Sequence, residues 1–157
     1  MNFTTTAKTA VAAAGIAIIA ISTAGPASAK TATGKFGQWG WIRDPYGIVT
    51  AWKIDNLQPS SDTIPNYPLT GKLWEATAWV KARQGSVTPI IPDLNGRTDS
   101  GVNYQVVWQA YTPAGISGAT LSEGQSATGK VYFDVTDGNP TRVAYYDGVE
   151  DKLVWQK

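Results

Sequence analysis

The stretch that decides the fold is LWEATAWVK, residues 73–81. Its residues alternate between the two faces of an extended strand, because successive side chains of a β-strand point to opposite sides. One face carries Trp74, Ala76, Ala78 and Val80. The other face carries Leu73, Glu75, Thr77 and Trp79. A large ring on each face indicates a central strand of a sandwich, and the rest of the chain is expected to pack around it.

The first 29 residues have the order of parts that is typical of a secretory signal peptide. Lys8 is followed by the apolar run AVAAAGIAIIAI at residues 10–21, and ASA at residues 27–29 matches a small-residue cleavage site. We therefore predict cleavage between Ala29 and Lys30, with residues 4–22 helical before removal. A short membrane anchor or a buried helix is the alternative. The expected division is a signal peptide at residues 1–29 and one domain at residues 30–157, with no stable membrane anchor after cleavage.

The composition of the mature chain excludes several classes of chemistry. Of 13 Lys and Arg residues only Lys8 lies in the first 29 residues, so 12 basic and 12 acidic residues remain and the formal charge is zero. A neutral domain without a basic stripe argues against binding to nucleic acid or to an anionic membrane. The chain has no Cys and no His, which rules out disulfides, thiolate nucleophiles, Ser-His-Asp machinery and histidine metal ligands.

Strand patterns separated by turn signals cover the mature chain, and we find no convincing helical period. We expect a flexible tail at residues 30–34, a crossover at 55–70 and a turn-rich connection at 93–101. We expect strands at residues 36–43, 48–54, 73–81, 86–91, 102–111, 129–135, 141–146 and 152–155. The pattern predicts an all-β, immunoglobulin-like antiparallel two-sheet β-sandwich or a small barrel. Strand 73–81 is expected to lie beside 102–111 and 129–135, with Trp74, Trp108 and Trp155 in the core.

Six blocks of the sequence, in order, resemble a known family. They are GKLWEATAWV (71–80), GSVTP (85–89), GVNYQVVWQ (101–109), ISGAT (116–120), TGKVYFDV (128–135) and EDKLVW (150–155). They resemble the small secreted immunogenic antigens of mycobacteria, the culture-filtrate proteins of MPT and MPB type. The resemblance implies an immunoglobulin-like sandwich, secretion and antigenicity, and it implies no catalytic residues. The QWGWIR run at residues 38–43 departs from the family pattern.

Acidic residues near the C-terminus are a first candidate site. Asp134, Asp137, Asp147, Glu150 and Asp151 could offer oxygen ligands to calcium from neighbouring loops. Ordinary turn chemistry is the simpler explanation of Asp before Gly, and no D-x-D-x-D-G loop is present. We therefore predict no metal site and no cofactor, with calcium binding near Asp137 and Asp147 left open.

Two further candidates involve carboxylates and aromatic rings. Glu75 with Asp134 could form the carboxylate pair of a glycan hydrolase, although an outward Glu paired with a cation on a neighbouring strand is the simpler interpretation. The second candidate is a binding strip of exposed rings, with core packing as the alternative. Its members would be Trp39, Trp41, Tyr46 and Tyr67.

These observations predict an exported, non-enzymatic protein that binds a host or cell-envelope protein. We expect a monomer, with no catalytic residues assigned and the binding residues unknown. The alternative is a carbohydrate-binding module or a carboxylate-based glycan hydrolase, which would use exposed Trp residues with Glu75 and Asp134. Aromatic residues clustered around an open groove with two carboxylates would favour that alternative.

Overall fold

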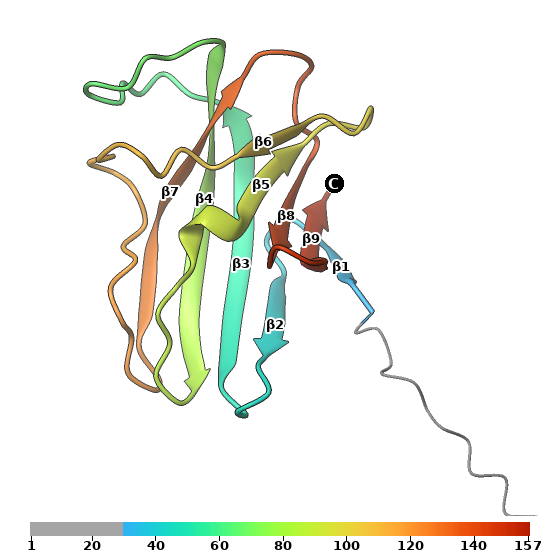
Figure 1. The fold of residues 1–157 in the computed structure, drawn as a ribbon, viewed down its shortest axis with the longest axis vertical. Helices are drawn as coiled ribbons and strands as arrows, with labels where there is room; N and C mark the ends of the chain where they lie inside the picture. Colours follow the sequence, from blue (N-terminus) through green and yellow to red (C-terminus); the bar gives the residue numbers. More distant parts are fainter. Residues whose placement is uncertain (1–29) are drawn as a thin grey trace, which may run out of the picture.

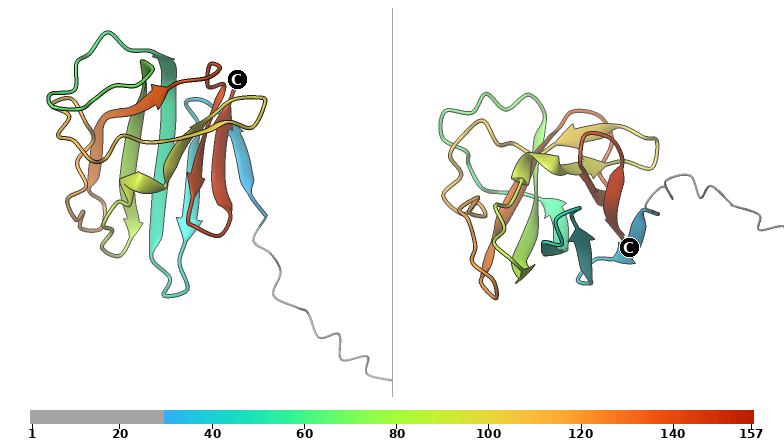
Figure 2. Two further views of the ribbon diagram at one scale, coloured as in Figure 1. Left: turned by 45° about the horizontal axis from the view of Figure 1, so that its top comes forward. Right: turned by 60° about the horizontal axis from the view of Figure 1, so that its bottom comes forward.

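The computed structural model describes residues 30–157, which form two β-sheets facing one another (Figures 1 and 2). One sheet has the strand order β2-β3-β4-β7 and the other the order β1-β9-β8-β5-β6. The predicted signal helix at residues 4–22 and Ala29 lie outside the described residues. The elements are β1 (Ala32–Lys35), β2 (Trp39–Arg43), β3 (Val49–Pro59), β4 (Lys72–Gln84), η1 (Ile91–Asp93), β5 (Leu94–Arg97), β6 (Asn103–Gln105), β7 (Ser126–Val135), β8 (Arg142–Tyr146) and β9 (Asp151–Gln156).

The all-β, immunoglobulin-like sandwich is confirmed, and neighbouring strands are antiparallel except for the parallel pair β1–β9. Between residues 30 and 157 the structure contains no helix that is long and apolar enough to cross a membrane.

Strand β4 occupies the interior of the four-stranded sheet, as its two-faced pattern predicts. It pairs with β3 on one side and with β7 on the other, so the expected partner at residues 129–135 is confirmed. The expected partner at residues 102–111 is wrong. Only Asn103–Gln105 is a strand there, and it lies at the edge of the other sheet. Val106 and Val107 are both buried because the chain leaves β6 and crosses towards β7, where the Val107 N–H donates to the Tyr132 carbonyl.

The core lies between the sheets and is built around large rings. Trp74, Ala76, Ala78 and Val80 all face it, as predicted for one side of β4. Trp155 is also in the core, and its Nε1–H donates to the Gln38 carbonyl at 2.9 Å. Burial of one such ring removes about 200 Å² from water, which helps a cysteine-free domain to be stable. Trp108 was predicted to join them, but that prediction is wrong: 54% of its surface is exposed, because the segment after β6 is not a strand.

The N-terminal segment is ordered by the C-terminal strand, so the prediction of a flexible tail at residues 30–34 is wrong. Strand β1 pairs in parallel with β9, and the Thr31 hydroxyl donates to the Asp151 carbonyl. The strands predicted at residues 36–43 and 48–54 pair as the antiparallel hairpin of β2 and β3. Its turn is held by Asp44, whose Oδ1 accepts the N–H groups of Tyr46 and Ile48, and Gly47 there has a φ of 86°.

The segment after β4 differs from the sequence prediction in two ways. The return strand at residues 86–91 is reduced to one isolated bridge between Val87 and Leu121, followed by η1. The turn-rich connection at residues 93–101 instead contains β5, an inner strand of the five-stranded sheet. Gly96 reads locally as a turn residue, yet it allows close approach of the sheets: a Cβ there would lie 3.2 Å from the Phe133 ring.

Candidate binding surface

The outer face of the four-stranded sheet is divided into a covered half and an open half. Along β4 the outward residues are Leu73, Glu75, Thr77, Trp79 and Lys81, because the opposite residues face the core. Leu73 and Glu75 are buried, whereas Trp79 and Lys81 are partly exposed. The crossover of residues 60–71, at the top of Figure 1, produces this difference by folding back over one end of the sheet. The small cluster under it is formed by Ile64, Leu73, Val107 and Tyr132.

The covered half contains a charged network centred on Lys130 of β7. The Lys130 ammonium lies 2.7 Å from Asp62 Oδ2 and 2.9 Å from Glu75 Oε2. The Tyr132 hydroxyl donates to Asp62, and the Ser60 hydroxyl donates to Glu75 at 2.5 Å. The prediction that Glu75 faces outward and pairs with a cation is therefore correct, but the crossover buries Glu75, while Lys130 stays partly exposed.

The network holds both carboxyl groups in their charged form. Burial acts to raise the pKa of Glu75, but the hydrogen bonds from Ser60, Lys130 and Gln58 outweigh it, and the pKa lies below its usual value. The hydrogen bonds from Lys130 and then from Tyr132 likewise lower the pKa of Asp62. Those same carboxylates raise the pKa of Lys130.

The candidate hydrolase pair, Glu75 and Asp134, lies within this covered half. Leu73 pairs with Asp134 and Glu75 pairs with Tyr132, so the two acids are diagonal neighbours on adjacent strands, about 7–8 Å apart. Asp134 accepts the N–H groups of Thr70 and Gly71 at 2.8 and 2.7 Å, which anchors the end of the crossover. A general acid needs a raised pKa, whereas that of Glu75 is lowered. The structure therefore brings the two residues near one another, and each of them holds part of the crossover in place.

The open half carries a row of alternating aromatic and cationic side chains. Trp39 of β2 is the register partner of Lys53 in β3, which is in turn the partner of Trp79 in β4. The Lys53 ammonium lies 3.9 Å from the centroid of the Trp79 ring and 5.4 Å from that of Trp39. These distances are within the range of cation–π attraction. We name this row the Trp–Lys–Trp row.

A second row lies beside the first. Trp41, two residues along β2 from Trp39, is in register with Ala51, which pairs with Lys81. Trp39 is 39% exposed and Trp41 is 57% exposed, so both rings lie on the protein surface and not in the core. Ala51 is buried among the side chains around it, whereas the Trp41 ring at the edge strand stays largely in solvent.

The predicted aromatic strip of four residues forms only in part. Tyr46 is exposed in the turn of the β2–β3 hairpin, near the two tryptophans in the chain. Tyr67 packs on the cluster under the crossover, where burial and then the charge of Asp134 raise its pKa. Lys53 was not named as a site residue from the sequence. Trp79 was also given no role in a site, although the alternation of residues 73–81 placed Trp79 on the face opposite Trp74.

The open half also gathers cations that the net charge conceals. Arg43, Lys53, Lys81 and Arg83 occupy outward positions on β2, β3 and β4. Within residues 30–157 none of the four forms an ion pair, because the observed pairs use Arg97, Lys130, Arg142 and Lys152. A domain with equal numbers of acids and bases therefore presents a local excess of positive charge.

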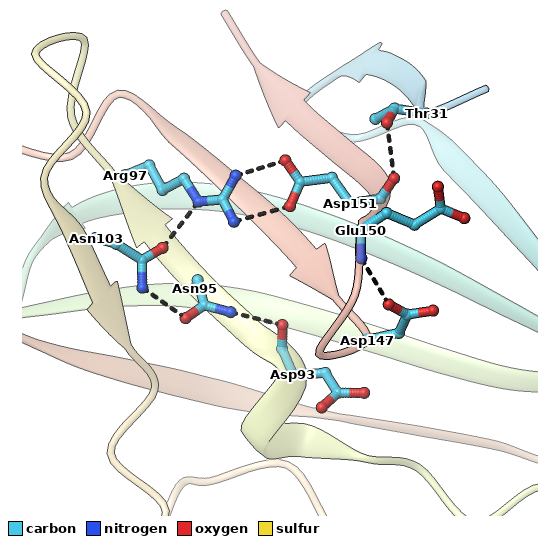
Figure 3. A network of polar contacts seen from close by, with 8 residues as sticks. All are labelled: Thr31, Asp93, Asn95, Arg97, Asn103, Asp147, Glu150 and Asp151. Carbon is cyan, nitrogen blue, oxygen red and sulfur yellow. Dashed lines mark hydrogen bonds and ion pairs between the residues drawn. The ribbon is translucent and has the colours of Figure 1, made fainter. Parts of the chain in front are cut away.

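The C-terminal acidic residues are distributed among separate structural roles (Figure 3). Asp151 forms a two-bond ion pair with Arg97, with distances of 2.5 and 2.8 Å. Asp147 accepts the N–H groups of Val149 and Glu150 within its own turn, which is the turn chemistry expected from the sequence. Glu150 is bonded to Lys152 at 2.5 Å.

Asp134 lies on β7, where it anchors the end of the crossover, and Asp137 lies beside Tyr104. In the described part of the chain, no three acidic side chains come together in a way that could hold a metal ion. Figure 3 also shows the Arg97 guanidinium bonded to Asn103, which extends the network towards Asn95 and the Asp93 carbonyl.

A cavity of about 540 Å³ lies away from the open half, between the segment after β6 and η1. Its lining includes the exposed Trp108 and Tyr111 together with Ile91 and Ile116. The Trp–Lys–Trp row thus lies on a sheet surface and is separate from this cavity.

Comparisons with known proteins agree with this architecture. The family model described as "Domain of unknown function (DUF1942)" matches residues 31–155. Immunogenic protein MPB63 of Mycobacterium bovis and immunogenic protein MPT63 of Mycobacterium tuberculosis are each 48% identical over 158 residues, covering 99% of this chain and 99% of the relative.

A solved structure is also similar. The 1.5 Å crystal structure of MPT63, a secreted protein from Mycobacterium tuberculosis, matches with a TM-score of 0.80 and 49% identity. The match covers 83% of this chain and all of that chain. The resemblance noted in the six sequence blocks is therefore confirmed. The chain belongs to the DUF1942 family of mycobacterial secreted immunogenic proteins, together with MPT63 and MPB63.

Proposed function

We propose that this chain is a secreted, non-catalytic protein that binds a host or cell-envelope partner through the open half of its four-stranded sheet. The observation that carries the proposal is the Trp–Lys–Trp row, in which Lys53 lies between Trp39 and Trp79 on an uncovered sheet face. Secretion is supported by the signal-peptide pattern of residues 1–29 and by the secreted relative MPT63.

The composition of the open half supports a binding role. Tryptophan and arginine are enriched at protein recognition surfaces, and an exposed ring gains most when a partner covers it. Trp41 has 57% of its surface exposed to solvent. At the other end of the same sheet face, the crossover covers the ring of Tyr132. The chain therefore covers only one half of the outer sheet face and leaves the other half exposed to solvent.

The state of the carboxylates supports a non-catalytic role. Glu75 accepts hydrogen bonds from Ser60, Gln58 and Lys130, and the crossover limits the access of a substrate to it. Asp134 is occupied by two backbone N–H groups. A hydrolase that used these residues would first have to break the contacts that hold the crossover.

The test compares two double variants of the secreted protein recovered from culture medium. Trp39→Ala with Trp41→Ala removes the exposed rings of the open half. Trp108→Ala with Tyr111→Ala removes two exposed rings elsewhere and serves as the matched control. Retention is measured on mycobacterial cell-envelope fractions and on intact host cells, with circular dichroism to verify folding.

We expect the first double variant to lose at least tenfold in apparent affinity and the control to stay within twofold of the unchanged protein. Equal binding by all three proteins would overturn the proposed surface. Turnover of a glycan, ester or peptide that Glu75→Gln abolishes would overturn the non-catalytic assignment.

A further inference from the structure

We infer that the open half binds an acidic polysaccharide, with sugar rings against Trp39 and Trp41 and anionic groups at Lys53 and Lys81. The inference rests on the proposed function and names the chemical class of the partner. It is carried by three observations: the local charge, the repeat of the rows and the size of the open surface.

The charge of the surface selects an anionic partner. Arg43, Lys53, Lys81 and Arg83 share the open half and none forms an ion pair within the described residues. The acid that shares the outward face of β3 with Lys53 is Asp55, one row further towards the covered half. Glu123 lies near Arg83, where its carboxylate accepts the Gly85 N–H at 2.7 Å. Arg43, Lys53 and Lys81 remain without a carboxylate partner among the described residues, and such a group of cations attracts a polyanion.

The arrangement of the rows fits a polymer that repeats a ring and a charge. Neighbouring strands are about 4.8 Å apart, so Trp39 and Trp79 lie about 10 Å apart with the Lys53 ammonium between them. About 7 Å along the strands, the Trp41 row also combines a ring with a cation, but there Lys81 lies two strands from Trp41, with Ala51 between them. A chain of sugar acids offers an apolar ring face and an anionic group at every unit.

The size of the surface distinguishes a polymer from a folded protein. Two rows across four strands span about 200 Å², whereas a stable protein interface buries about 800 Å² on each partner. The covered half limits this surface at one end of the sheet, and at the other end only Arg43 and Arg83 extend it along β2 and β4. One extended chain a few sugar units long matches this area, and the sheet position of the rows favours a chain over a single sugar held in a pocket.

The orientation of the rings disfavours insertion into a lipid surface. The Lys53 ammonium lies against the ring faces of both tryptophans, so these rings flank a charge at the level of the sheet. The neighbouring outward residues Ala51, Ser126 and Thr128 are short, and insertion into acyl chains depends on a larger apolar area.

The experiment measures binding of the secreted protein to five probes by biolayer interferometry at 50 and 300 mM NaCl. The probes are polygalacturonate, heparin, neutral dextran, poly-L-glutamate and phosphatidylglycerol vesicles. The variants are Trp41→Ala, Lys53→Gln and the charge-conserving Lys53→Arg. The controls are Lys72→Gln, an exposed lysine of β4 outside the rows, and Tyr111→Ala.

We expect polygalacturonate and heparin to bind at least tenfold more tightly than dextran at 50 mM NaCl, and more weakly at 300 mM NaCl. Trp41→Ala and Lys53→Gln should each weaken this binding by at least fivefold, while Lys53→Arg and both controls stay within twofold. Equal or tighter binding to dextran or poly-L-glutamate would overturn the inference, because rings or charge alone would then suffice. Preference for vesicles would overturn it in favour of a lipid partner.

The two proposals fail in different ways. If neither acidic polysaccharide binds but Trp39→Ala with Trp41→Ala still abolishes retention on cells, the inference is wrong and the proposed function stands. If retention on cells does not depend on these tryptophans, the proposed function itself is wrong.

Discussion

Glu75 of β4 and Lys130 of β7 form an ion pair, with 2.9 Å between Oε2 and Nζ, on the half of the sheet face that the crossover covers. Lys130 also contacts Asp62 of the crossover at 2.7 Å. One ammonium therefore connects two strands of the sheet to the segment that lies over them. The ion pair consequently helps to decide where the covered half ends and the open half begins.

Glu75→Gln should lower stability in a pH-dependent way. The folded-state pKa values of Glu75 and Asp62 lie below the unfolded values of 4.5 and 3.8. Their contribution is therefore complete above those values and is lost as pH falls through the folded-state pKa values. At pH 7 the variant should unfold with a free energy about 1–2 kcal/mol smaller, since a hydrogen-bonded charge is lost.

Denaturant titration at pH 7, 5, 4 and 3 measures this effect. The difference between the variant and the unchanged protein should shrink below pH 4.5, because Glu75 is then protonated in the unfolded chain. A difference that stays constant down to pH 3 would contradict the role of the charged carboxylate.

Trp74→Ala should cost about 3–5 kcal/mol, because it empties a buried ring site between the sheets. Trp108→Ala removes the same ring from an exposed position and should cost less than about 1 kcal/mol. Urea unfolding followed by circular dichroism compares the two. Similar losses for both variants would show that the assignment of Trp74 to the core face is wrong.

Arg97→Lys should destabilise the five-stranded sheet by about 1 kcal/mol. Arg97 donates two bonds to Asp151 and a third to Asn103, and an ammonium does not reproduce this planar arrangement. Arg142→Lys is the matched control, because Arg142 makes a single contact to the well-exposed Asp99 and exposed pairs contribute little. Thermal unfolding of both variants tests this, and equal shifts in Tm would contradict it.

Gly129→Ala should destabilise the protein by about 1–3 kcal/mol through steric crowding. A Cβ at residue 129 would lie 2.5 Å from backbone atoms of Ile116, whose N–H donates to the Lys130 carbonyl. Thr128→Ala, on the exposed outer face, should change the unfolding free energy by less than about 0.5 kcal/mol. Hydrogen exchange of the Ile116 amide should quicken in Gly129→Ala only, and unchanged protection would refute the crowding.

Sequence patterns predicted the strands whose alternation is uninterrupted. Strand β4 follows from its period-two alternation, and the strands predicted at residues 36–43 and 48–54 contain β2 and most of the first half of β3. The same reasoning failed at residues 102–111, where alternation around Tyr104 extends past the true end of β6. Val106 and Val107 are both buried there because the chain passes from one sheet to the other. The alternation of apolar and polar residues within a strand cannot predict where the chain changes from one sheet to the other.

The candidate surface was predictable in part for the same reason. Trp39 and Trp41 were candidates for exposure because tryptophan is seldom fully buried and is common at binding surfaces, and the structure places both outward on β2. Lys53 was missed because its position between two rings depends on the register of three strands. Tyr67 was wrongly grouped with them because the path of the crossover was unknown.

The amino-acid sequence is sufficient to establish that the chain is all-β, that it carries an export signal pattern and that β4 has two distinct faces. These are local properties, since side-chain alternation follows from the extended backbone alone. The distinction between Glu75 and Trp79, four residues apart on the same face, is not local. It arises in the folded molecule because residues 60–71 return over one end of the sheet, bury Glu75 beside its partner Lys130, and leave Trp79 next to Lys53 on the open half.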